Sequence, residues 1–211
     1  MTHRRSWRHL ASRTVAAVAI LISTAVSAYT GQVVDSQTQQ GIPHVSVVVQ
    51  YVGSVAMIVE SRRLCFDVDL VQTDDNGNFD VSLVSKKASP LISRQKTNIL
   101  IYASGYKNPP GPMGSGPRFA LDPDHRLPVD RMRDTAILAG HMKCASEDRQ
   151  REVLLPVYRA IYAEFKALAP QPTLAERGWL STALFNVERL ELGYERASEN
   201  FSKRKQDGRA K

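Results

Sequence analysis

The fold of this 211-residue chain is decided by residues 31–35 (GQVVD), 41–51 (GIPHVSVVVQY), 73–79 (TDDNGNF) and 99–106 (ILIYASGY). In the second segment Val45, Val47, Val49 and Tyr51 occupy every other position, which is typical of a strand with one buried face. Asn76-Gly77 is a dipeptide favoured in tight hairpins, and the alternation resumes after it. Short strands separated by turn residues favour an antiparallel β-sandwich over a parallel α/β sheet.

Two further strands are expected between Gly53 and Thr73. Residues 55–60 form a candidate short strand, and residues 64–70 alternate again. Since neighbouring side chains of a strand point to opposite faces, one face should carry Leu64, Phe66, Val68 and Leu70. The other face should then carry Cys65, Asp67 and Asp69.

Taken in order, these segments resemble the carboxypeptidase regulatory-like domain. This is a transthyretin-like β-sandwich that accompanies zinc carboxypeptidases and occurs in many exported bacterial proteins. The resemblance covers residues 29–106 and is carried by Gly31, Asp35, Pro43, Asp74, Gly77, Phe79, Gly105 and Tyr106. It implies an antiparallel Greek-key sandwich that serves as a folding or recognition module, in which these residues set turns and fill the core. The segment between Val49 and Thr73 is longer than the usual connection of the family, which suggests an additional hairpin.

The N-terminus has the composition of a secretory signal. Four arginines and no acidic residue precede an apolar stretch over residues 14–26, and small residues follow at Val26-Ser27-Ala28. We therefore expect a signal peptide over residues 1–28 and a periplasmic or secreted protein; the alternative is an inner-membrane anchor formed by residues 14–28. Without these four arginines the net charge falls from +7 to +3. Much of that remainder lies in the tail, so nucleic-acid binding is not expected.

After Tyr106 the pattern changes. Residues 107–128 are rich in proline and glycine and read as an irregular loop that completes the sandwich region 29–128, with a last edge strand possible at 119–121. Residues 129–202 have helical periodicity and predict a helical hairpin or small bundle, which makes the fold class α+β. A first helix is expected near 137–142, a second after Ser146 with a kink or restart at Pro156, and a third from the capping box Thr173-Leu-Ala-Glu176 to about Phe201. Residues 203–211 are expected to be a disordered basic tail.

The chain has two cysteines, Cys65 and Cys144. In an oxidising compartment, two cysteines favour one disulfide, with two free thiols as the alternative. A bond between them would tie the helices to the outer face of the sheet. It would contribute about 4 kcal/mol through the restricted entropy of the unfolded chain.

No catalytic site, cofactor or metal site is expected. None of His44, His125 and His141 is followed three residues later by Glu, so the zinc-binding pattern of carboxypeptidases is absent from the sequence. His141-x-x-Cys144 supplies only two of the four ligands of a closed zinc site. In residues 74–80 the glycine is in the wrong register for an EF-hand, and the chain has no Gly-x-Ser-x-Gly element.

Two hypotheses for function follow. The first is a non-enzymatic binding module of the bacterial cell envelope that recognises a protein, peptide or surface polymer. Its expected binding elements are residues 51–73 and the proline/glycine loop. The second is a structural subunit that assembles through a sheet edge or the helical hairpin. A hydrolase with an unrecognised site is a weaker third.

Overall fold

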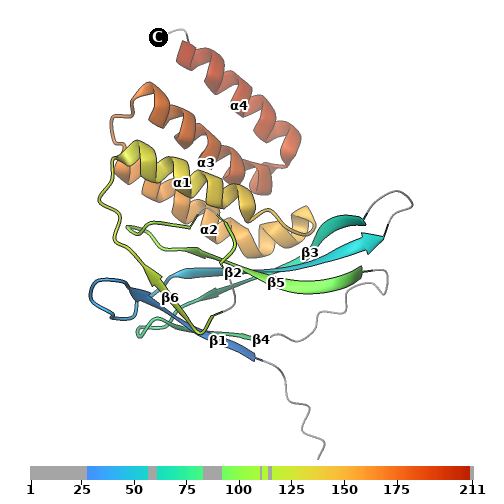
Figure 1. The fold of residues 1–211 in the computed structure, drawn as a ribbon. Helices are drawn as coiled ribbons and strands as arrows, with labels where there is room; N and C mark the ends of the chain where they lie inside the picture. Colours follow the sequence, from blue (N-terminus) through green and yellow to red (C-terminus); the bar gives the residue numbers. More distant parts are fainter. Residues whose placement is uncertain (1–27, 57–60, 83–91, 110, 114–115, 210–211) are drawn as a thin grey trace, which may run out of the picture.

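The computed structural model describes residues 28–56, 61–82, 92–109, 111–113 and 116–209. The predicted signal segment, apart from Ala28, lies outside these residues. In the described part, two β-sheets and a layer of helices are stacked on one another (Figure 1), which confirms the α+β class. None of the described helices combines the length and apolar character needed to cross a bilayer.

The strands form two three-stranded sheets, one with the order β4-β1-β6 and one with the order β3-β2-β5. Their bounds are β1 Ala28–Asp35, β2 Ser46–Ala56, β3 Ser61–Gln72, β4 Asn78–Ser82, β5 Ile92–Tyr102 and β6 Arg118–Leu121. The pairing is antiparallel except between β1 and β6, which run parallel. The expectation of a wholly antiparallel sandwich was therefore wrong at this edge. A long connection reaches β6, so β6 is not bound to the antiparallel pairing that a tight hairpin imposes.

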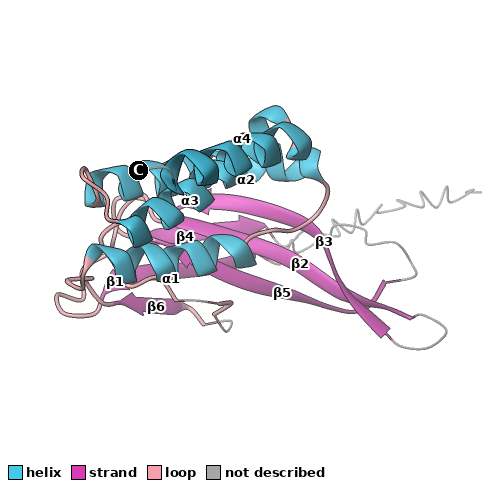
Figure 2. Cartoon of the chain, turned by 90° about the horizontal axis from the view of Figure 1, so that it is seen from above, coloured by secondary structure: helices cyan, strands magenta, loops and turns pink. Residues whose placement is uncertain are grey.

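Two hydrophobic cores lie on either side of the β3-β2-β5 sheet. The core between the sheets contains Val33, Val47, Phe79, Ile101 and Phe119, among others. The second core joins Val48 and Leu100, on the opposite face of the same sheet, to side chains of the helices. The prediction that residues 45–51 form a half-buried strand was thus wrong for β2, because the helices cover its second face. Figure 2 shows the helices lying over this sheet, with the far ends of β2, β3 and β5 extending beyond them.

The expected alternation along β3 is interrupted by a bulge. Tyr51 is paired with Asp67 and Val52 with Cys65, so Phe66 has no partner on β2. The extra residue shifts the faces, and Cys65, Val68 and Leu70 pack against the helix-side core while Phe66 packs between the sheets. The strand predicted at residues 55–60 does not stand alone, since Val55 and Ala56 are the last residues of β2 and residues 57–60 lie outside the described part. Strands β2 and β3 form one long hairpin.

The helices are α1 Pro128–His141, α2 Glu147–Leu168, α3 Leu174–Leu192 and α4 Tyr194–Arg209. Helix α1 begins earlier than predicted because Pro128 suits the first turn, where its missing N–H is not needed. The Ser146 cap and the Thr173/Glu176 capping box are confirmed. A kink or a restart was expected at Pro156. Helix α2 continues through this residue, so it does not restart there, and the kink stays a prediction.

The predicted third helix is two helices, because Gly193 adopts a φ of 89° between α3 and α4. Helix α4 continues to Arg209, so residues 203–209 are helical rather than disordered. Arg204 forms an ion pair with Glu188 of α3 at 2.8 Å, and this contact holds the basic end of α4 in place.

Candidate functional site

The best-defined candidate site is a cavity of about 660 Å³ between α2, α3 and α4. We call it the helical groove. Residues from the end of α2, the first half of α3 and the last part of α4 line it, together with the turn that joins α2 to α3. The lining side chains are mostly apolar and include Leu174, Leu180, Leu184, Tyr162, Phe201 and Pro172.

The groove exists because α3 is apolar on more than one face. Ala183, Val187 and Leu190 are buried in the helix-side core. Leu174 and Leu184 point elsewhere and line the groove, and the Leu174 side chain is 73% exposed. A helix that is hydrophobic on all sides is normally covered on all sides. The first half of α3 is therefore only partly covered.

Helix α4 covers the second half of α3 with very few apolar residues. The Phe185 ring lies 6.0 Å from the Tyr194 ring and 5.4 Å from the Phe201 ring, and Ala197 is fully buried. The remainder of α4 is polar. In Figure 1, α4 lies outermost, separated from the sheets by the other helices.

The polar residues around the groove are predominantly basic. Lys166, Arg177, Arg204 and Lys205 are among its lining residues, and no acidic residue is. Glu188 neutralises Arg204 through two hydrogen bonds of 2.8 and 2.9 Å. In the part of the chain that the structure describes, no carboxylate forms an ion pair with Lys166, Arg177 or Lys205. One uncompensated cation therefore comes from each of the three helices.

Two of these cations lie against aromatic rings. The Lys166 ammonium is 5.8 Å from the centre of the Tyr162 ring, and the Lys205 ammonium is 5.2 Å from the centre of the Phe201 ring. These contacts hold the lysine side chains at the rim and leave their charges open to an anion. The groove thus combines an apolar floor with a positive border.

The predicted disulfide between Cys65 and Cys144 is present, with its Cα atoms 5.2 Å apart. It joins β3 to the segment before α2. Beside it, Arg149 of α2 bonds to Asp67 at 3.1 Å and to Asp69 at 2.6 Å, and the Tyr51 hydroxyl donates to Asp69 at 3.0 Å. This cluster spans the exposed edge of the sheet and fastens the helices to it.

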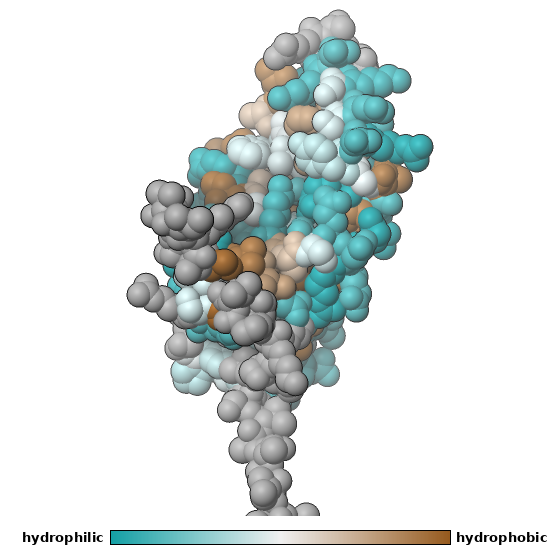
Figure 3. All heavy atoms as spheres, turned by 90° about the vertical axis from the view of Figure 1, so that its right-hand side faces the viewer, coloured by the Kyte–Doolittle hydropathy of each residue, from teal (hydrophilic) through white to brown (hydrophobic). Residues whose placement is uncertain are grey.

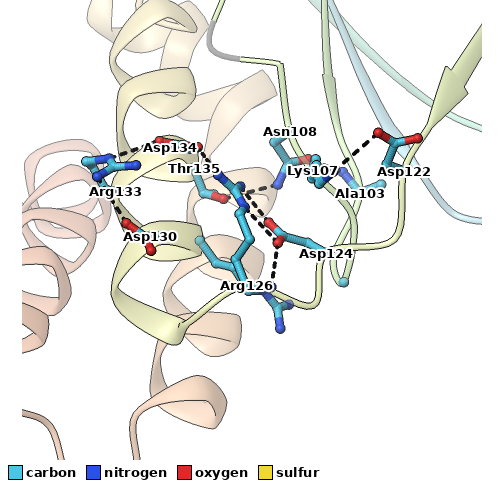
Figure 4. A network of polar contacts seen from close by, with 12 residues as sticks. Ala103, Lys107, Asn108, Asp122, Asp124, Arg126, Asp130, Arg133, Asp134 and Thr135 are labelled. Carbon is cyan, nitrogen blue, oxygen red and sulfur yellow. Dashed lines mark hydrogen bonds and ion pairs between the residues drawn. The ribbon is translucent and has the colours of Figure 1, made fainter.

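A second network fixes the loop before α1 (Figure 4). Arg126 donates to both oxygens of Asp124 and, at 2.6 Å, to Asp134 of α1. The hydrogen bonds from Arg126 lower the pKa of the Asp124 carboxyl, which is almost fully buried. Each of the three charged groups, Asp124, Arg126 and Asp134, is thus paired with another of the three. The triad therefore has a structural role, and the loop is held against α1.

A third buried contact centres on Glu164 of α2. Its carboxylate accepts hydrogen bonds from the Tyr102 hydroxyl at 2.7 Å and from Arg131 at 3.0 Å. Burial, followed by the nearby Glu164 charge, raises the pKa of Tyr102. The phenol therefore stays protonated and joins β5 to the helices.

The residues that carry the resemblance to the carboxypeptidase regulatory-like domain lie in turns and in the core. The Asp35 carboxylate accepts hydrogen bonds from the N–H groups of Gln37 and Thr38, and one from the Tyr106 hydroxyl at 3.1 Å. Asp74 accepts from the backbone of the 74–78 turn, and Phe79 is buried between the sheets. Of the other residues in this set, Gly31 packs against the ring of Phe79, Pro43 is exposed, and Gly105 has a φ of 83°. The structure brings Asp35 and Tyr106 together, but as a turn contact.

The groove was not among the predicted binding elements. The described residues between 51 and 73 belong mainly to β2 and β3. Those between 107 and 128 belong to β6, to the loop held by Arg126 and to the start of α1. A signal was present in residues 174–192, where leucines and aromatic residues recur without one clear polar face. A hydrophobic patch also occurs on the face shown in Figure 3, next to residues drawn in grey. The surroundings of this patch lie partly outside the described residues, whereas all the residues that line the helical groove are described. The groove is therefore taken as the candidate site.

No group of three or more His, Cys, Asp or Glu side chains in the described ranges is placed to hold a metal ion. No protein-family model matches the chain, and no curated protein is similar to it in sequence. Among solved structures, a 9R-lipoxygenase from Cyanothece aligns over 88% of this chain and 31% of its own, at 15% identity and a TM-score of 0.25. This similarity is too low to support an argument about fold or function.

Proposed function

We propose that this protein is an exported, non-enzymatic binding module of the bacterial cell envelope that engages a protein, peptide or polymer partner through the helical groove. In this proposal the two sheets are a Greek-key scaffold of the carboxypeptidase regulatory-like type, and the helices supply the recognition surface. The observation that carries the proposal is an apolar groove with uncompensated cations from three helices. An exposed apolar surface that is bordered by polar residues is typical of a site that contacts a partner.

Two features support the location. The Cys65–Cys144 disulfide is typical of proteins that fold in an oxidising compartment outside the cytoplasm. The arginines and the apolar stretch of residues 1–28 have the order of a signal peptide. A periplasmic or secreted location is the simplest explanation of both.

A structural subunit that assembles with copies of itself is less well supported. If it assembled through its helices, its contact surface would include the exposed face of α3, and the border of that face is basic. In a two-fold symmetric pair built on this face, the basic borders of both copies would lie in the same interface. Like charges brought together in this way oppose association.

Affinity capture from an envelope extract tests the proposal. The mature protein, beginning at Tyr29, is immobilised beside the double variant Arg177→Glu/Lys205→Glu. A variant with one of the same charge changes outside the groove, Arg196→Glu on α4, serves as control. We expect a partner that the wild type and the control retain and the double variant does not. Retention of the same partner by all three proteins would show that the groove is not the binding site.

A further inference from the structure

We infer that the occupant of the helical groove is an acidic amphipathic α-helix of a partner protein. The inference rests on the proposed function and makes it more specific. It depends on the shape of the groove, its unfilled floor and its charge.

The shape fits a helix. Helix α3 forms the floor, and it packs against α2 and also against α4. The lining residues of α3 extend from Leu174 to Leu184, which corresponds to about 15 Å or three helical turns. A helix laid along this floor would contact three helices at once, as in other helix-in-groove complexes.

The floor contains unfilled space between its leucines. A Cβ atom built on Gly178 would meet, within 4 Å, no described atom other than those of its two chain neighbours and the nearby backbone of its own helix. Ser181, a second small residue, lies one turn further along the same lining. Small residues on a helix allow the backbone of a second helix to approach closely, and the flanking Leu174 and Leu184 offer apolar contacts on each side.

The charge selects the kind of helix. Lys166, Arg177 and Lys205 come from three different helices, and no lining residue opposes them. A row of carboxylates beside an apolar stripe can meet all three, whereas the single head group of a fatty acid meets fewer. The basic sequence Lys203-Arg204-Lys205 makes the α4 helix of a second copy a poor occupant. Opposite charge at the rim therefore specifies an acidic partner.

The test uses synthetic peptides of about fifteen residues, long enough for roughly four helical turns. The first peptide carries leucine at helical spacing and glutamate on both flanks. In the second, lysine replaces each glutamate. The third has the composition of the first but no helical period. Fluorescence anisotropy with the full mature protein measures the dissociation constant of each peptide.

We expect the acidic periodic peptide to bind at least about tenfold more tightly than either of the other two. Gly178→Leu should fill the floor and weaken that binding by about tenfold or more, while the thermal stability is kept because leucine is a better helix former than glycine. Arg177→Glu/Lys205→Glu should reverse the preference and favour the lysine peptide. Arg196→Glu, outside the groove, should change none of these values.

Equal binding of the periodic and scrambled peptides would overturn the inference, as would binding that is unaffected by Gly178→Leu. Dodecanoate is the probe for the competing occupant. If dodecanoate bound saturably, Gly178→Leu abolished that binding, and the three peptides had similar dissociation constants, the occupant would be a small amphiphile. The inference of a helix in the groove would then be wrong. In either case, an envelope partner whose capture depends on the groove would leave the broader proposed function standing.

Discussion

The disulfide between Cys65 and Cys144 makes the most direct test of how the helices are attached to the sheets. The bond joins residues 79 positions apart in the sequence. According to the chain-entropy relation, closing a loop of this length lowers the entropy of the unfolded chain. This loss stabilises the folded state by about 4.5 kcal/mol at 25 °C. At about 2–4 °C per kcal/mol for a chain of this size, reduction should lower the melting temperature by about 9–18 °C.

Urea unfolding of residues 29–211, with and without a phosphine reductant, measures this difference in stability. The reduced wild type keeps both sulfur atoms, so the packing of the nearly buried Cys144 changes little. The double variant Cys65→Ala/Cys144→Ala loses that packing as well and should be less stable than the reduced wild type. Reduction should also make the free energy of unfolding fall more steeply with urea concentration, because the reduced unfolded chain exposes more surface than the cross-linked one. Free energies of unfolding within about 1 kcal/mol of each other in the two redox states would refute the reasoning.

Three further predictions concern the fold. Gly77→Ala should lower the free energy of unfolding in urea by more than about 3 kcal/mol, because φ is 76° and the new Cβ would lie 2.3 Å from the Val33 carbonyl oxygen. Gly105→Ala, at a φ of 83° but with open space around the new Cβ, should lower it by only about 1 kcal/mol. Equal losses for the two variants would contradict the packing argument. Glu164→Gln should lower the free energy of unfolding by about 1–3 kcal/mol, because the largely buried guanidinium of Arg131 loses its charged partner. A loss below about 0.5 kcal/mol would show that the contact is dispensable. The lowered pKa of Asp124 contributes stability that is complete above about pH 4 and is lost as the pH falls through the folded pKa. Asp124→Asn should therefore reduce the loss of unfolding free energy between neutral and acid pH. An unchanged dependence of stability on pH would assign that loss to other groups.

The sequence was informative where structure is set locally. Alternation at period two located β2 and β4, and the cap at Ser146 and the capping box at Thr173 located the starts of α2 and α3. The disulfide was predicted from the presence of only two cysteines in the sequence and from the expected export of the chain. Each of these signals lies within a few neighbouring residues or in the composition.

The features that were missed depend on contacts between distant segments. The bulge at Phe66 is defined by the pairing of β3 with β2, and neither strand alone encodes that register. The second buried face of β2 depends on helices that begin only at Pro128. The groove required α4 to form a helix, and with Tyr194, Ala197 and Phe201 as its main apolar residues that helix has a weak pattern of its own. Its position is set by the ring of Phe185 and by the pairing of Arg204.

The order of the strands has a consequence for the time course of folding. Strand β1, the first described element of the chain, is the central strand of its sheet, and its partner β6 follows all the other strands in the sequence. The β2–β3 hairpin closes a short loop and can form early, whereas β1 must close two long ones. We therefore expect β1 to keep at least one unpaired edge until residues 118–121 have arrived. During that interval at least one row of its backbone hydrogen-bonding groups is open to wrong partners, so residues 28–35 are the segment most exposed to misassembly while the protein folds.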